Sequence, residues 1–170
     1  MRWACWMLLW VGLAVAASGQ TATRERWRAA TPVELEAALP ARPAVEKEHI
    51  ETEMRTANGI INSHNQMIAA VVLITAGYAA DGKYSHFLLV QSPLVLDGHL
   101  TLKPGNYVVG WRRSDEGLEV HFFDSAKGTE LGSVIARPEP GTRVESFHIW
   151  PPSEHKDIQI GRFFLPYSLP

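Results

Sequence analysis

The chain has 170 residues, 46% of them hydrophobic, and its 16 Lys and Arg residues nearly balance its 18 Asp and Glu residues. That length suits one domain with one core. The charge balance gives no electrostatic reason to expect a nucleic acid or an anionic lipid surface as a partner, so we expect neither.

The first 19 residues predict a secretory signal peptide. Arg2 supplies a basic end, an apolar run extends from Trp3 to Ala17, and small residues follow to Gly19. The run is shorter than the roughly 20 residues that a membrane span needs, so we expect cleavage, no stable membrane anchor, and a periplasmic or extracellular protein. The chain's one cysteine, Cys5, lies in this leader, which predicts a mature chain without disulfides or thiolate chemistry.

A short helix is expected after the leader. Thr31 is a capping hydroxyl, Pro32 suits the first helical position, and Glu34 completes a capping box. Pro40 and Pro43 should end the helix within about two turns. Residues 20–45 therefore read as a tether that carries this helix.

The next segment is ambiguous between strand and helix. Residues 50–56 alternate in polarity as a strand does, whereas the apolar positions from Ile50 to Ile68 also follow a helical spacing. Asn58-Gly59 is typical of a tight turn, and we therefore predict two strands around it, with a helix over residues 48–76 as the alternative.

A buried strand is predicted over residues 69–75, which form a continuous apolar run rich in β-branched side chains. Residues 80–83 read as a turn into a second strand over 84–91. These two strands should form a central hairpin.

The second half predicts an antiparallel meander. Turn clusters recur every 7 to 11 residues, with strands between them. Two faces are expected to point inward, the first with Tyr107, Val109 and Trp111 and the second with Leu118, Val120 and Phe122. Two more strands should lie near residues 143–150 and 158–164. The predicted fold is mostly β, an antiparallel β-sandwich or small barrel with a short N-terminal helix, divided as 1–19 signal peptide, 20–45 tether and 46–170 β-sandwich domain.

The stretch from Leu102 to Val109, with Lys103-Pro104-Gly105-Asn106 before Tyr107, resembles a pattern in small exported bacterial β-sandwich domains of the transthyretin-like and carboxypeptidase-regulatory-like kind. The resemblance covers residues 95–135 and includes no catalytic residue. It implies a sandwich fold and a turn from which Tyr107 re-enters the core.

Histidines on separate predicted strands raise the possibility of a metal site. His86, His121 and His148 could bind a transition metal together with Asp124 or Glu145. This supports one alternative function, a metal-binding protein or metal-dependent enzyme. The other interpretation is that these histidines are ordinary strand side chains, and no cofactor is then expected.

Aromatic residues are dense in the last 60 residues, and three of them are candidate ligand-binding residues: Trp111, Trp150 and Phe123. The other interpretation is a second core layer. No catalytic residue is assigned, because the sequence has neither a nucleophile elbow nor a glycine-rich nucleotide motif. We therefore expect an exported non-enzymatic binding or interaction module for a protein, carbohydrate or apolar ligand, with a structural subunit of an envelope assembly as a further alternative.

Overall fold

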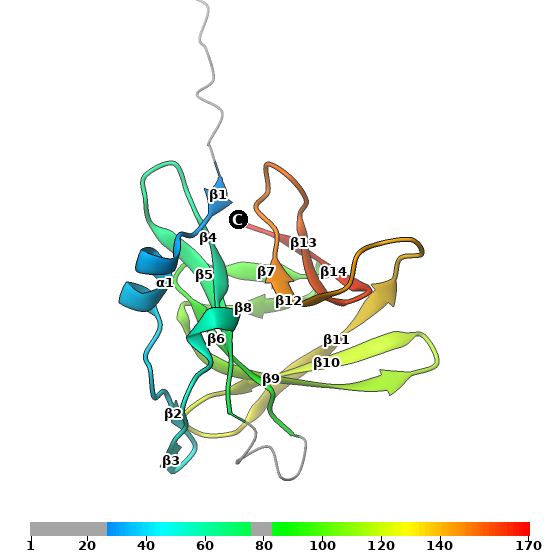
Figure 1. Cartoon of the computed structure of the whole chain (residues 1–170). Coiled ribbons are helices and arrows are strands. Elements are labelled where there is room, and N and C mark those ends of the chain that lie inside the picture. Colours follow the sequence, from blue (N-terminus) through cyan, green and yellow to red (C-terminus); the bar gives the residue numbers. More distant parts are fainter. Residues whose placement is uncertain (1–26, 76–82) are drawn as a thin grey trace, which may run out of the picture.

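The computed structural model describes residues 27–75 and 83–170 (Figure 1). The predicted signal peptide and most of the turn predicted over residues 80–83 lie outside these residues. In the described part the protein is mostly β, as predicted, with one short α-helix.

The described elements follow one another in short steps along the chain. They are β1 (Arg28–Ala29), α1 (Pro32–Ala38), β2 (Ala44–Val45), β3 (Glu48–His49), a 3-10 helix (Met54–Thr56), β4 (Asn58–Ile61), β5 (Met67–Leu73), β6 (His86–Val90), β7 (Leu94–Leu96), β8 (Leu100–Leu102), β9 (Gly105–Ser114), β10 (Gly117–Asp124), β11 (Glu130–Pro138), β12 (Glu145–Ile149), β13 (Asp157–Gly161) and β14 (Phe163–Ser168).

Twelve of the described strands form one antiparallel sheet. Its main path runs β1-β4-β5-β6-β9-β10-β11-β14-β13-β12, and β7 joins β14 to β8. The sheet curls so that β12 returns to contact β4 and β5 (Figure 1). No β-ladder joins β12 to β4 in the described residues. Instead, the side chain of Asn58 hydrogen-bonds to the backbone of Phe147 and Ile149, and we call these two contacts the Asn58 bridge.

The curl gives the sheet two apolar faces. The inner face encloses the main core, which includes Leu88, Val109 and Phe122. The outer face of β4, β5, β6, β9 and β10 carries a second core, which α1 and residues 45–50 cover. Residues 67–72 of β5 are buried throughout, so the predicted strand with two buried faces is confirmed.

The helix begins as predicted. Thr31 accepts from the Glu34 amide, and the Glu34 carboxylate accepts from the Thr31 amide at 2.8 Å. Leu35 and Leu39 are buried in the second core, so residues 27–45 pack on the sheet and the predicted tether is corrected there. No helix in residues 27–75 or 83–170 is long and apolar enough to cross a membrane.

The turn predicted at Asn58-Gly59 is wrong, because these two residues begin β4. A Cβ on Gly59 would lie 2.6 Å from the Ala69 carbonyl oxygen, so close strand packing requires glycine there. The actual turn spans 62–66, where the Asn62 side chain accepts from the amides of His64 and Gln66. The predicted strand over residues 50–56 is replaced in part by the 3-10 helix.

The meander predicted for the second half is confirmed in part. β9, β10 and β11 pair in chain order, as do β7 with β8, β12 with β13 and β13 with β14, but β8 does not pair with β9 and β11 does not pair with β12. Asp97 and Gly98 form the predicted turn with positive φ angles of 46° and 74°. Tyr107 re-enters the core and donates to the Lys103 carbonyl at 2.6 Å, as expected for that turn. The single strand predicted over 158–164 is instead two strands, β13 and β14, because the chain reverses at Gly161 with φ of 65°.

Candidate functional site

An open groove of about 380 Å³ lies where β9 and β10 face β12, β13 and β14. Its floor consists of the apolar side chains Leu118, Ile160 and Phe163 with the indole of Trp111. The volume falls within the ~300–1,000 Å³ range of small-molecule sites, which are concave and mostly apolar with few polar groups.

The alternation along β9 positions Trp111. Val109 is fully buried in the main core, Trp111 two residues later is half-buried, and Arg113 is exposed. Their partners on β10 confirm the register, because Trp111 pairs with Val120 and Arg113 pairs with Leu118. The inner face of β9 therefore changes from core to open groove at Trp111.

Two aromatic neighbours from other strands support Trp111. The Trp111 ring lies 5.3 Å from the His86 ring of β6 and 6.1 Å from the Phe147 ring of β12. The rings of His86 and Phe147 are themselves 5.1 Å apart. Tilted ring contacts at such separations are favourable, so His86 of β6 and Phe147 of β12 hold the indole of Trp111 in place.

His86 is buried and neutral. The Ser85 hydroxyl donates to the Val109 carbonyl at 3.1 Å, so imidazole Nδ1 carries the proton and donates to the Ser85 oxygen at 3.1 Å. Burial lowers the pKa of His86 to about 4. The imidazole therefore acts as a polar member of an aromatic cluster at neutral pH.

The groove rim carries charged residues with different partners. Arg112 Nε contacts Glu119 at 2.7 Å, and this pair lies on the outer face of the sheet. Arg143 Nε lies 3.5 Å from Glu145. Arg113 lies over the Phe163 ring, 5.5 Å from its centroid.

Four polar side chains of the described residues line the groove beside its apolar floor: Arg112, Arg113, Glu145 and Ser146. Ser146 is the one hydroxyl among its described lining residues, and that lining contains no histidine to activate it. Apolar contact and the charged rim are the chemistry that the groove offers.

The predicted metal triad is not brought together. His86 lies on the inner face with Leu88, whereas His121 alternates with Val120 and Phe122 and so lies on the outer face. His148 also points outward, because Phe147 and Ile149 on either side of it belong to the main core. In residues 27–75 and 83–170, no group of three or more His, Cys, Asp or Glu side chains could hold a metal ion.

His121 belongs to a network of polar side chains on the outer face. Its Nδ1 lies 2.6 Å from Glu130, and its Nε2 lies 3.7 Å from Glu119. Ser133 also donates to Glu119 at 3.1 Å. This network accounts for His121 without a ligand.

The other predicted aromatic site residues lie apart from Trp111. Trp150 donates from Nε1 to Gln159 at 3.0 Å, and its ring lies 4.3 Å from the ring of His148 on the outer face. Phe123 is buried in the second core, where its ring meets that of Tyr84 at 5.1 Å. Phe123 therefore matches the interpretation as a second core layer.

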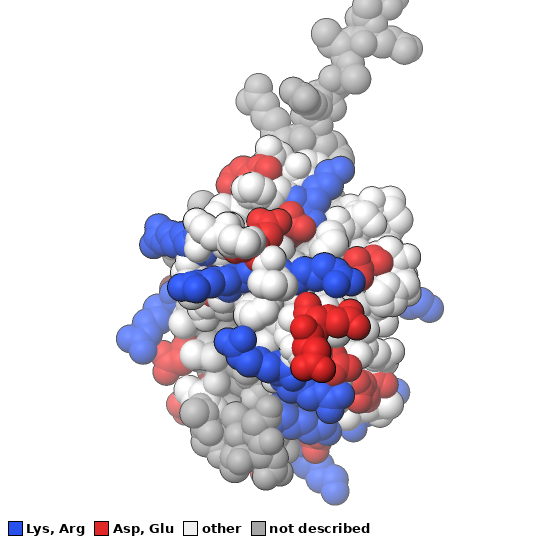
Figure 2. Space-filling view, turned by 90° about the vertical axis from the view of Figure 1, so that its right-hand side faces the viewer, with Lys and Arg blue, Asp and Glu red and all other residues white. Residues whose placement is uncertain are grey.

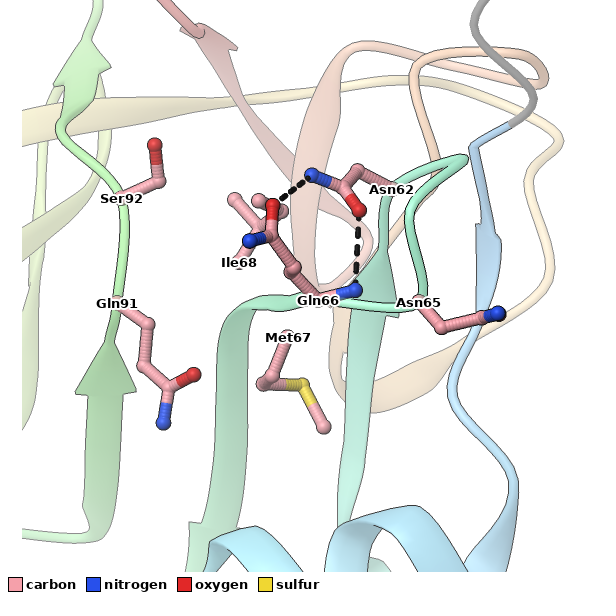
Figure 3. A pocket seen from close by; sticks show the side chains of 7 residues that line it. All are labelled: Asn62, Asn65, Gln66, Met67, Ile68, Gln91 and Ser92. Carbon is pink, nitrogen blue, oxygen red and sulfur yellow. Dashed lines mark hydrogen bonds between the residues drawn. The ribbon is translucent and has the colours of Figure 1, made fainter.

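A second hollow, of about 450 Å³, lies beside the 62–66 turn. Figure 3 shows that Asn62 and Gln66 bond to each other, through the 2.9 Å contact of their amides and the 3.0 Å contact to the Gln66 backbone. The side chains of Gln91 and Ser92 both extend to the same side of their strand end in that view. This hollow is the weaker candidate, because Asn62 and Gln66 already bond to each other and no aromatic side chain is among the described residues that line it.

Charge is mixed on the face that Figure 2 presents. Lys and Arg side chains lie beside Asp and Glu side chains over this surface, without a broad area of one sign. Such a surface suits individual charged contacts better than a polyanion, whose binding relies on many cations acting together.

The sequence indicated Trp111 but missed the groove that it lines. Arg113 and Leu118 could have been found from the alternation of β9 and β10, whereas Ile160 and Phe163 needed the turn at Gly161. Comparison with family models, with curated proteins and with solved structures finds no match to this chain.

Proposed function

We propose that this protein is an exported, non-enzymatic binding module that holds a small molecule with a flat apolar face in the Trp111 groove. The observation that carries the proposal is the half-buried indole of Trp111 on the floor of the groove, held by His86 and Phe147. Tryptophan has a large face that binds apolar ligands strongly when water is displaced. Export rests on the leader predicted from residues 1–19.

An apolar ligand is favoured over a large protein surface. The exposed large apolar side chains of the described residues are Val33, Leu131 and Val144, on α1, on β11 and before β12. They are separate along the chain and belong to different elements. Scattered residues of this kind are normal on a monomer, so they do not favour the role in an envelope assembly.

Titration with phenylnaphthylamine tests the proposal, because this uncharged dye fluoresces in apolar surroundings and accepts excitation from nearby indoles. Trp111→Leu keeps an apolar side chain but removes the ring, and should weaken dye binding about tenfold. Trp150→Leu is the matched control on the outer face and should leave the affinity unchanged.

A second variant separates lost binding from lost folding. Ser146 is exposed on the groove rim, so Ser146→Trp adds bulk there without touching the core. It should block the dye while circular dichroism and the melting temperature stay at wild-type values. Dye binding that survives both Trp111→Leu and Ser146→Trp would overturn the proposal.

A further inference from the structure

Arg113 is the inner-face cation at the mouth of the groove. It follows Trp111 by two residues on β9, so both side chains point to the same side of the sheet. Its guanidinium lies over the ring of Phe163, another residue of the groove floor. One positive group therefore lies beside the apolar floor of the groove.

The charge of Arg113 is not neutralised by the described residues. Its neighbours on the rim are paired, Arg112 with Glu119 and Glu145 with Arg143. No carboxylate in residues 27–75 or 83–170 lies within ion-pair distance of Arg113. The groove therefore offers an apolar floor beside one cation that is free to accept an anion.

We infer that the occupant of the groove is a small amphipathic organic anion, with its apolar part on Trp111 and its anionic group on Arg113. This inference rests on the proposed function and specifies the ligand class. A guanidinium stacked on an aromatic ring keeps its edge N–H donors free, and its planar fork matches a carboxylate or sulfonate. An organic cation is disfavoured because Glu145 is already engaged by Arg143.

Two dyes that share one scaffold test this inference. Anilinonaphthalene sulfonate carries an anionic group, and phenylnaphthylamine lacks it. Arg113→Gln should weaken binding of the sulfonate dye about tenfold, since a hydrogen bond to a charged group is worth about 1.5 kcal/mol or more. The same substitution should leave the affinity for the uncharged dye unchanged.

Arg137→Gln is the matched control. It removes the same charge from an exposed residue of β11, which lies 3.9 Å from Glu116 and is not among the residues that line the groove. Affinity for both dyes should stay at the wild-type value. Added salt should weaken binding of the sulfonate dye to the wild type and have little effect on the Arg113→Gln variant.

The outcomes separate the two claims. If both dyes bind in a manner that depends on Trp111, but Arg113→Gln and Arg137→Gln affect the sulfonate dye equally, the inference fails and the binding module stands. If Trp111→Leu changes the affinity for neither dye, the binding module fails with it. A loss confined to the sulfonate dye and to Arg113→Gln supports the inference.

Discussion

The side-chain oxygen of Asn58 accepts a hydrogen bond from the backbone N–H of Ile149 at 2.8 Å, and its Nδ2 donates to the carbonyl of Phe147. One side-chain amide thus pairs with strand β12 as a backbone peptide would. It joins the two ends of the curled sheet where no ladder of strand pairs does so in the described residues.

Asn58→Ala should destabilise the protein by about 2 kcal/mol, because two hydrogen bonds are lost and two backbone groups of β12 lose their partner. Asn58→Asp should cost at least as much, since a carboxylate cannot donate to the Phe147 carbonyl. Urea unfolding measures both. Asn106→Ala, at an exposed side chain, is the control, and an equal loss there would contradict this role for Asn58.

Stability should fall in acid because of His86. Its pKa is lowered from an ordinary value of 6.5 to about 4, so the unfolded state takes up a proton before the folded state does. The stabilisation is therefore fully present above pH 6.5 and is lost as the pH falls toward 4, by about 3 kcal/mol in all. Burial lowers the pKa of His148 as well, which adds to the loss in the same direction.

His86→Phe tests this origin of the acid sensitivity, because it keeps a ring against Trp111 and Phe147 but cannot be protonated. Urea unfolding of the variant at several pH values between 7 and 4 should show a clearly flatter dependence than the wild type. If the free energy of unfolding depends on pH as steeply in His86→Phe as in the wild type, His86 is not the main source of the acid sensitivity.

Gly59→Ala should destabilise the fold by about 2 kcal/mol, the usual cost of forcing extra volume into a packed core. The new Cβ would approach the Ala69 carbonyl oxygen to 2.6 Å and the Ala70 Cα to 2.9 Å, and these backbone atoms cannot rotate away. Gly105→Ala is the comparison, because its nearest atom is the Tyr107 hydroxyl at 3.2 Å, the far end of a side chain. Similar losses in thermal unfolding would refute the steric explanation.

The Thr31 cap of α1 should contribute measurably to the free energy of unfolding, because α1 covers part of the second core. Thr31→Ala removes the side chain that accepts from the Glu34 amide and should cost about 1 kcal/mol. Val33→Ala, at a side chain that is 75% exposed on the same helix, should change the free energy of unfolding by less than about 0.5 kcal/mol. Denaturant unfolding of the two variants measures both losses, and an equal loss in Val33→Ala would contradict the role of the cap.

The features that could be predicted from the sequence depend on neighbouring residues. The Thr31 cap involves residues three apart, and the inner face of β9 follows from strict alternation through Val109 and Trp111. The face of His121 could also be predicted, since it alternates with Val120 and Phe122. Only the pairing of β6 with β9 shows that His86 lies on the opposite face.

The features that could not be predicted depend on distant residues. Asn58-Gly59 has the local chemistry of a turn, but Asn58 bonds to a strand 89 residues further along the chain, and Gly59 is required by the approach of Ala69. The groove likewise needs Phe163, which faces Trp111 only after the reversal at Gly161. Tertiary contacts outweighed local preference at these positions.

The Asn58 bridge also sets an order of events during synthesis. Because the bridge connects positions 89 and 91 residues apart, it cannot form until the ribosome has released residues 147 and 149. Until then the nascent chain carries β4 without its partner at this position, and bare strand edges recruit other chains. Contacts of such long separation slow folding as well, so the emerging polypeptide is exposed to self-association for longer than a locally connected helical protein of the same size.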